Sequence, residues 1–196
     1  MPRPAIKRKS PRRISTAVRV RLAKPSAGQP GKAAATPRGA LGAGSKAPAF
    51  SLPAIGRGVA GGKVSSADLK GKSYVLYFYP KDDTSGCTAE ACGFRDSIAG
   101  FNKLGLTVIG VSKDSLASHE KFAKKYDLNF PLASDEKGEL LARYGVWVKK
   151  SMYGRSYMGV ERSTFLIDGK GAVRAAWRKV SVPRHVEEVR KAAAEL

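Results

Sequence analysis

The chain has 196 residues, of which 42% are hydrophobic and 8% aromatic, and it carries a formal net charge of +20. This length fits one domain of ordinary size with an extra segment, and no apolar run approaches the roughly 18 residues that a membrane-spanning helix needs. Two cysteines are too few for the disulfide framework of a small secreted protein, so we expect a soluble protein of a reducing compartment, most simply the cytoplasm.

The start of the chain differs in composition from the rest. Residues 1–46 contain twelve Lys and Arg residues, and the first acidic residue of the chain is Asp68. The segment has no aromatic residue and no regular apolar period, so it cannot bury enough surface to offset the entropy of ordering. We therefore predict a disordered basic tail over residues 1–44 and a folded domain over residues 45–196.

Several roles fit this basic tail. It could bind nucleic acid without sequence preference by neutralising phosphates. The run KRKSPRR at residues 7–13 could direct the protein to the nucleus, and the acid-free, Arg-rich and Ser-rich start also suits an organelle transit peptide. A solvated tail without a dedicated role is the remaining alternative, so nucleus and organelle stay open beside the cytoplasm.

Apolar patterning predicts alternating strands and helices in the domain. Residues 73–79 (SYVLYFY) are a nearly continuous apolar and aromatic run, which is typical of a central strand buried on both faces. From Cys87 onward, apolar residues recur at spacings of four and three, which predicts the buried face of an amphipathic helix. These positions are Cys87, Ala91, Phe94, Ile98 and Phe101.

Shorter patterns predict the other elements. They are strands at 50–52, around 64, at 106–111 and at 146–148, helices at 115–126, 138–144 and 183–196, and a hairpin of 163–167 with 172–177. A strand–helix–strand–helix block followed by a hairpin and a final helix predicts an α/β protein with a thioredoxin-like fold, in which helices flank a mixed central sheet.

Cys87 stands at the start of its predicted helix, where a cysteine can become a nucleophile. Free N–H groups and the positive end of the helix dipole stabilise a thiolate there. If such a thiolate acts on a peroxide, the site also needs hydrogen-bond donors for both oxygens, because negative charge grows on the leaving oxygen as the O–O bond breaks. Thr84 can place a hydroxyl beside the sulfur, and an arginine from another element would complete the set.

Three segments resemble the peroxiredoxin family. Residues 80–87 (PKDDTSGC) match its P-x-x-x-T-x-x-C active-site signature. Residues 87–96 (CTAEACGFRD) are similar to the bacterioferritin comigratory protein, or Q-type, subgroup, in which a second cysteine lies five residues after the first. Residues 159–168 (GVERSTFLID) resemble the strand that carries the active-site arginine of that subgroup. The resemblance extends over about residues 45–196.

This resemblance implies a thiol-dependent peroxidase for hydrogen peroxide and organic hydroperoxides. Cys87 would be the peroxidatic cysteine and Cys92 the resolving cysteine of an atypical 2-Cys cycle, with Thr84 and Arg162 polarising the peroxide and Pro80 shielding the pocket. The family implies no metal, haem or flavin cofactor, regeneration by thioredoxin or a similar dithiol protein, and a monomer.

The cysteine spacing adds a mechanical expectation. On an ideal helix, residues five apart rise ~7.5 Å and rotate about 140°, so their Cα atoms lie roughly 8.7 Å apart. A disulfide needs less than about 7 Å. Cys92 can therefore capture oxidised Cys87 only if the first helical turns unwind, with Gly86 and Gly93 as soft points.

Other chemistry-bearing residues have simpler interpretations. We expect Asp82, Asp83, His119 and His185 to be exposed to solvent. Glu90 favours the helix dipole and lies close enough to Cys87 to tune its pocket. The rival function is a redox-sensing protein that binds nucleic acid through its tail, whereas a general dithiol oxidoreductase would carry a C-x-x-C motif that this sequence lacks.

Overall fold

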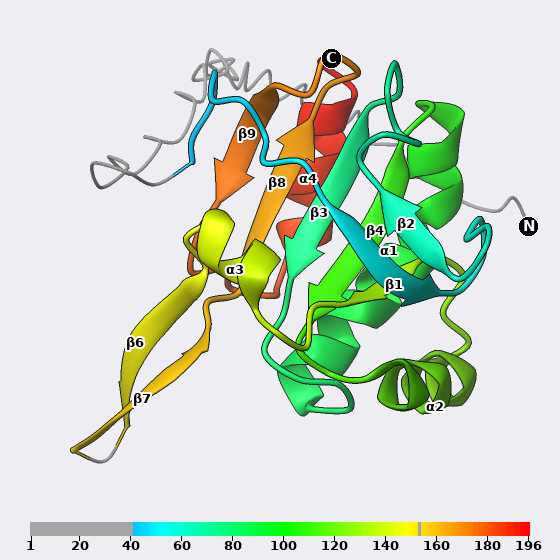
Figure 1. The fold of residues 1–196 in the computed structure, drawn as a ribbon. Coiled ribbons are helices and arrows are strands. Elements are labelled where there is room, and N and C mark those ends of the chain that lie inside the picture. The colour runs from blue at the N-terminus through cyan, green and yellow to red at the C-terminus, as the bar shows by residue number, and fades with distance from the viewer. Residues whose placement is uncertain (1–40, 153) are drawn as a thin grey trace, which may run out of the picture. The chain divides into compact units, whose positions relative to one another are not determined.

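The computed structural model describes residues 41–152 and 154–196, which contain nine strands and four helices (Figure 1). The strands are β1 Ser51–Ile55, β2 Lys63–Ser65, β3 Tyr74–Phe78, β4 Thr107–Ser112, β5 Leu132–Ser134, β6 Trp147–Met152, β7 Arg155–Val160, β8 Ser163–Ile167 and β9 Val173–Trp177. The helices are α1 Ser85–Lys103, α2 Leu116–Tyr126, α3 Glu139–Arg143 and α4 His185–Ala193. None of the described helices is long and apolar enough to cross a membrane.

Seven of the strands form one mixed sheet in the order β2-β1-β5-β4-β3-β8-β9. The pairs β3–β4 and β4–β5 are parallel, and the other neighbours are antiparallel. The remaining two strands, β6 and β7, pair only with each other among the described strands. This arrangement confirms the predicted thioredoxin-like fold.

Strand β3 lies inside the sheet, and all five of its residues are buried, as its apolar run predicts. Because side chains alternate along a strand, Leu76 and Phe78 face one hydrophobic core while Val75 and Tyr77 face another. Helices α1, α2 and α4 contribute to the second core, and α3 contributes to the first. The rings of Tyr77 and Phe94 stack at 4.7 Å, which fixes α1 against the sheet.

Residues just before 45 already pack on the domain. The Gly44 N–H donates to the Val173 carbonyl at 2.8 Å, and Lys46 forms a β-bridge with Ala172. Leu41 packs against the first core. Residues 1–40, which make up most of the predicted tail, lie outside the described residues.

Two parts of the strand pattern were not predicted. Strand β5 has only three residues, too few to show a period. Strand β6 extends well beyond the predicted 146–148 segment and pairs with β7 in six antiparallel residue pairs. The adjacent Lys149 and Lys150 break the apolar alternation that would have marked β6, so the sequence pattern hides this two-stranded ribbon.

Candidate active site

Cys87 is buried in the first turn of α1, in the hydrophobic core that also contains Val75 and Tyr77 of β3. Thr84 is the N-cap residue of this helix, but its hydroxyl donates to the Lys81 carbonyl at 3.1 Å instead of accepting a helix N–H. Cys92 lies on the same helix and is half-buried, and both thiols are free. The helix start therefore presents Cys87 as predicted, with an exposed Thr84 beside it.

Arg162 reaches Cys87 from a distant part of the chain, the junction of β7 and β8. Its Nη2 donates to Cys87 Sγ at 3.2 Å, and its Nη1 donates to Glu90 Oε2. One guanidinium thus bridges the thiol and a carboxylate, which its planar fork of donors suits. The structure brings Arg162 and Cys87 together, as the family resemblance implies.

Glu90 is part of this cluster and is completely buried. It lies three residues after Cys87, so both side chains project from the same face of α1. Burial raises the pKa of Glu90 to about 7, against the opposing effect of the Arg162 charge. For Arg162, burial acts to lower the pKa, but the charges of Glu90 and Cys87 outweigh it and raise the pKa. The expectation that Glu90 lies close to the Cys87 site is confirmed, but its ion pair with Arg162 was not predicted.

His185 is buried behind Glu90, which corrects the prediction that it is a surface residue. Its Nε2 lies 2.7 Å from Thr164 Oγ1 and 4.0 Å from Glu90 Oε1. The ring packs edge-on against Phe94 and Trp177 at the start of α4. Burial, aided by the Arg162 charge, lowers the pKa of His185 to about 4, so the imidazole is neutral at pH 7.

Asp82 and His119 form a second buried group, and the prediction that both are exposed is wrong. The Asp82 carboxylate lies 2.9 Å from His119 Nδ1 and accepts hydrogen bonds from Tyr79 and Ser118, each at 2.7 Å. Burial alone would raise the pKa of Asp82, but the hydrogen bond and charge of His119 dominate and lower it.

This group holds the loop that leads into Cys87. The Asp82 N–H donates to Asp114 Oδ2 at 2.9 Å, so both the backbone and the side chain of Asp82 are fixed. Asp83 is exposed, as predicted, and pairs with Lys125 at 2.7 Å. Pro80, predicted to shield the pocket, is exposed at the end of β3.

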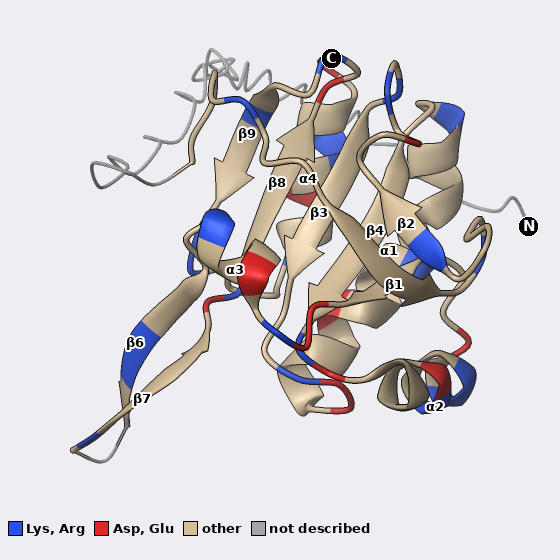
Figure 2. Cartoon of the chain, in the orientation of Figure 1, with Lys and Arg blue, Asp and Glu red and all other residues tan. Residues whose placement is uncertain are grey.

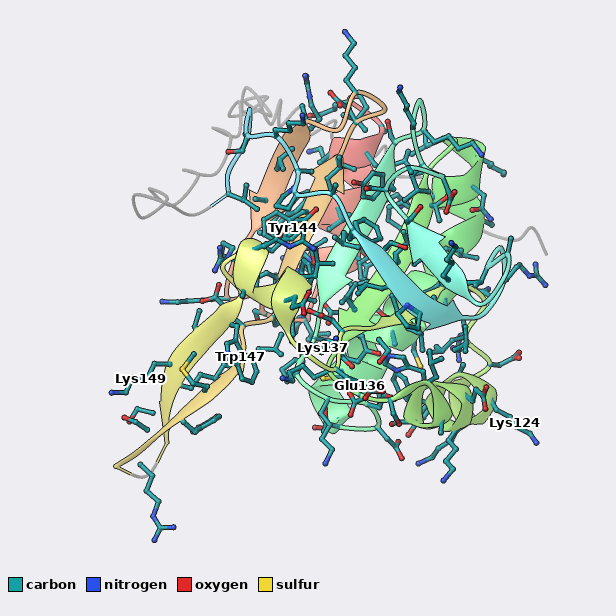
Figure 3. All side chains as sticks on the ribbon, in the orientation of Figure 1. Lys124, Glu136, Lys137, Tyr144, Trp147 and Lys149 are labelled. Carbon is teal, nitrogen blue, oxygen red and sulfur yellow. The ribbon has the colours of Figure 1, made fainter. Side chains whose placement is uncertain are left out.

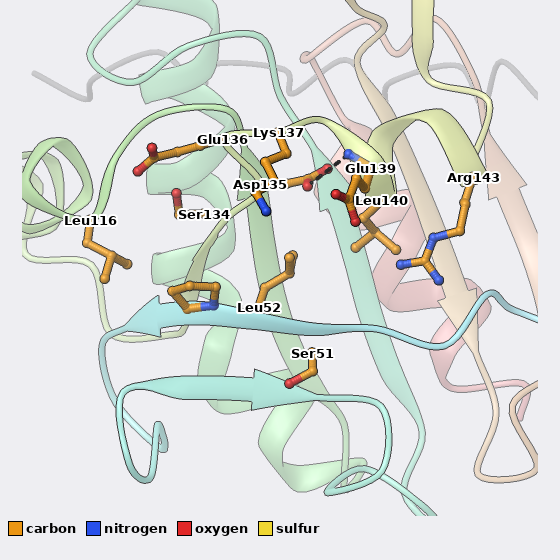
Figure 4. Close-up of a pocket in the computed structure, with 11 residues that line it drawn as sticks. Ser51, Leu52, Leu116, Ser134, Asp135, Glu136, Lys137, Glu139, Leu140 and Arg143 are labelled. Carbon is orange, nitrogen blue, oxygen red and sulfur yellow. Dashed lines mark hydrogen bonds between the residues drawn. The ribbon is translucent and has the colours of Figure 1, made fainter.

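A pocket of about 470 Å³ lies elsewhere on the domain, between β1 and the segment that contains α3 (Figure 4). It is lined by neither Cys87 nor Arg162. Its buried carboxylate, Asp135, accepts hydrogen bonds from the N–H groups of Glu139 and Leu141 and so caps α3. The pocket is therefore separate from the thiol, and its acid has a structural role.

Comparison with known proteins agrees with this geometry. The AhpC/TSA family matches residues 43–176. Peroxiredoxin Bcp of Bacillus subtilis is 50% identical over 145 residues, covering 74% of this chain and 90% of that one, and Peroxiredoxin Bcp of Escherichia coli K12 is 40% identical over 149 residues, covering 76% and 93%. The structure of Xanthomonas campestris Peroxiredoxin Q superimposes with a TM-score of 0.69 at 39% identity, covering 74% of this chain and 90% of that chain. The chain therefore belongs to the AhpC/TSA family and is a peroxiredoxin of the Bcp type.

Proposed function

We propose that Cys87 is the residue that reduces the peroxide in this thiol peroxidase, and that Arg162 assists it. The observation that carries this assignment is the 3.2 Å contact between Arg162 Nη2 and the buried Cys87 Sγ. The thiolate attacks one peroxide oxygen, an S–O bond forms, and the O–O bond breaks. The leaving oxygen takes up a proton as water or an alcohol, and Cys87 becomes a sulfenic acid.

Arg162 suits this step in two ways. Its fixed positive charge stabilises the attacking thiolate, and its donors can turn to the oxygen on which negative charge develops. The pairing of Arg162 Nη1 with Glu90 holds the guanidinium in place beside Cys87. Thr84, one turn before Cys87, is proposed as a further donor to the peroxide once its hydroxyl turns away from the Lys81 carbonyl. Pro80 is proposed as a wall of the approach.

We propose that Cys92 then resolves the sulfenic acid. The Cys92 thiol gives up its proton and attacks Cys87 Sγ, an S–S bond forms, and the S–O bond breaks as the hydroxyl takes up a proton and leaves as water. Helix α1 runs without interruption from Ser85 to Lys103, so the two cysteines are held at helical spacing in the reduced protein. At that spacing the disulfide is out of reach, and the first turns of α1 must open.

Two contacts near the start of α1 must break before its first turns can unwind. Glu90 is tied to Arg162, and Gly93 packs closely on α4, where an added Cβ would lie 3.2 Å from a methyl of Val186. We expect amide exchange over residues 84–95 to increase on oxidation. Unchanged exchange in a fully oxidised sample would contradict the unwinding step.

The substrates proposed are hydrogen peroxide and small organic hydroperoxides, with thioredoxin or a similar dithiol protein as reductant. One structure of the Xanthomonas campestris bacterioferritin comigratory protein, 39% identical to this chain, is described in terms of alkyl peroxide reduction. The test is peroxide-dependent NADPH oxidation with thioredoxin and its reductase. Cys87→Ser should abolish turnover, and equal turnover in Cys87→Ser and wild type would overturn the assignment.

The other expectations remain predictions. They are a monomeric state, a cytoplasmic location, and the alternative in which the basic tail binds nucleic acid. Salt-sensitive binding of the protein to DNA that disappears when residues 1–44 are removed would support the tail function. DNA binding that is unchanged by this removal would refute it.

A further inference from the structure

We propose that the ribbon formed by β6 and β7 is the docking arm for the reductant, and that this reductant is a small dithiol protein with an acidic surface. This inference rests on the proposed thiol-disulfide cycle. The arm is defined as the described residues 147–152 and 154–160.

The arm stands apart from the seven-stranded sheet. Figure 1 shows the two strands projecting beyond the body of the domain on the side of α3, and neither strand pairs with another described strand. Six residues of strand extend about 20 Å. An isolated two-stranded ribbon is marginally stable in water, and exposed strand edges promote unwanted association. A partner that covers the arm would stabilise the ribbon and shield its exposed strand edges.

The surface of the arm combines basic and apolar side chains. Tyr157 and Met158 are 46% and 49% exposed, and they are adjacent, whereas the other large exposed hydrophobic residues of the described chain lie at the end of α1 and at the C-terminus. Lys150 is paired across the strands with Tyr157, and Lys149 with Met158. Each face of the ribbon therefore carries one exposed large apolar side chain opposite one lysine, and the Lys150 Nζ also donates to the Val160 carbonyl at 2.6 Å.

No acidic residue offsets these charges along the arm. Residues 140–160 contain basic residues but no Asp or Glu, and Figure 2 shows the arm as blue and tan between its red-coloured base and its tip. Lys149 points away from the ribbon into solvent (Figure 3). Protein interfaces characteristically surround aromatic and Met anchors with polar groups, and complementary charge accelerates the encounter. These features fit an acidic protein surface.

The base of the arm is fixed to the active site. Glu161 follows β7, and its N–H donates to the Val146 carbonyl at 2.7 Å, just before β6. Arg178 binds both sides of the base, donating to Glu161 Oε1 and to the Gly145 carbonyl, each at 2.6 Å. Arg162, which contacts Cys87, directly follows Glu161 in the chain. A partner on the arm is thus held at a set position relative to the reacting thiol.

The reductant is the partner that this position favours. A peroxide is small and needs no docking surface, whereas a protein thiol must be brought to the disulfide and oriented there. A domain of 100 residues has a radius of gyration of about 13 Å, so it can contact a 20 Å arm and also reach Cys87, which Arg162 contacts beside the base of the arm.

The test compares three reactions of the full-length protein at low and high salt. These are oxidation by hydrogen peroxide, reduction of the oxidised protein by a thioredoxin of net negative charge, and reduction by dithiothreitol. One arm variant reverses charge (Lys149→Glu with Arg155→Glu), and another removes apolar surface (Tyr157→Ser with Met158→Ser). Matched controls are Lys63→Glu with Lys70→Glu near β2, and Leu104→Ser after α1; all three control positions are exposed, Leu104 to 42%.

We expect the arm variants to slow reduction by thioredoxin about tenfold, while the other two reactions and the controls stay at wild-type rates. For the charge reversal, the difference from wild type should shrink at high salt. Equal slowing with dithiothreitol, or no slowing with thioredoxin, overturns the proposal. The proposal is also overturned if the arm variants lose binding to DNA while thioredoxin still reduces them at the wild-type rate. If the wild type forms no Cys87–Cys92 disulfide, the proposed function itself fails.

Discussion

Replacing Arg162 tests how the guanidinium contributes to peroxide reduction. In the structure it makes two charge-assisted contacts at once, one with Cys87 Sγ and one with Glu90. Lysine keeps the positive charge but is a single compact ammonium group and cannot reproduce the fork. Arg162→Lys should therefore lose one of the two contacts, and Arg162→Met should lose both contacts and the charge.

The size of the effect follows from the contact that is lost. A hydrogen bond to a charged group is worth about 1.5 to 3 kcal/mol. If that contact acts in the transition state, Arg162→Lys should oxidise about 10- to 100-fold more slowly than wild type, because each 1.36 kcal/mol is a factor of ten. Arg162→Met should be slower than Arg162→Lys, because the thiolate and Glu90 then lack any cationic partner.

The assay is a single turnover in a Cys92→Ser background, with sulfenic acid trapped chemically and counted by mass spectrometry at a series of times. Circular dichroism and thermal melting establish that each variant is folded. A wild-type rate for Arg162→Lys would refute the argument from the fork. Equal rates for Arg162→Lys and Arg162→Met would refute the argument from the charge.

Two further predictions concern the buried groups. Asp82→Asn breaks the buried pair with His119, which should cost about 3 to 5 kcal/mol and lower Tm by roughly 10 °C. Asp83→Asn, at the exposed neighbour, should leave Tm nearly unchanged, and equal melting of the two variants would contradict the role given to Asp82. The pKa of His185 is about 4 in the folded protein and 6.5 in the unfolded chain, so the unfolded state binds more protons between these pH values. The free energy of unfolding therefore falls as the pH drops from 6.5 to 4, by up to about 3 kcal/mol. His185→Gln should remove this loss, and urea unfolding at pH 7 and pH 5 with the same difference in both proteins would refute the assignment.

Elements with a strong local pattern were predictable from the sequence. The apolar run of β3 and the spacing of apolar residues on α1 depend on neighbours within each segment, so they indicate the strand and helix directly. The family resemblance supplied what local patterns could not, because it placed Cys87 and Arg162 in one site although they are 75 residues apart.

The buried polar groups were not predictable in the same way. Asp82, His119 and His185 are buried because partners from other elements satisfy them, and an isolated polar residue in a sequence carries no sign of such a partner. Glu90 did carry a signal, because it shares the helix face of Cys87 and Phe94, and a charged residue on a buried face requires a counter-charge.

The most direct test of the central assignment is titration of the reduced protein with one equivalent of hydrogen peroxide, followed by thiol counting and mass spectrometry of wild type, Cys87→Ser and Cys92→Ser. Wild type should lose both free thiols to one intramolecular disulfide, Cys92→Ser should form a sulfenic acid on Cys87, and Cys87→Ser should remain unreacted. Oxidation of Cys92 in Cys87→Ser at the wild-type rate would contradict the account, because the attacking thiol would then not be the one that Arg162 contacts.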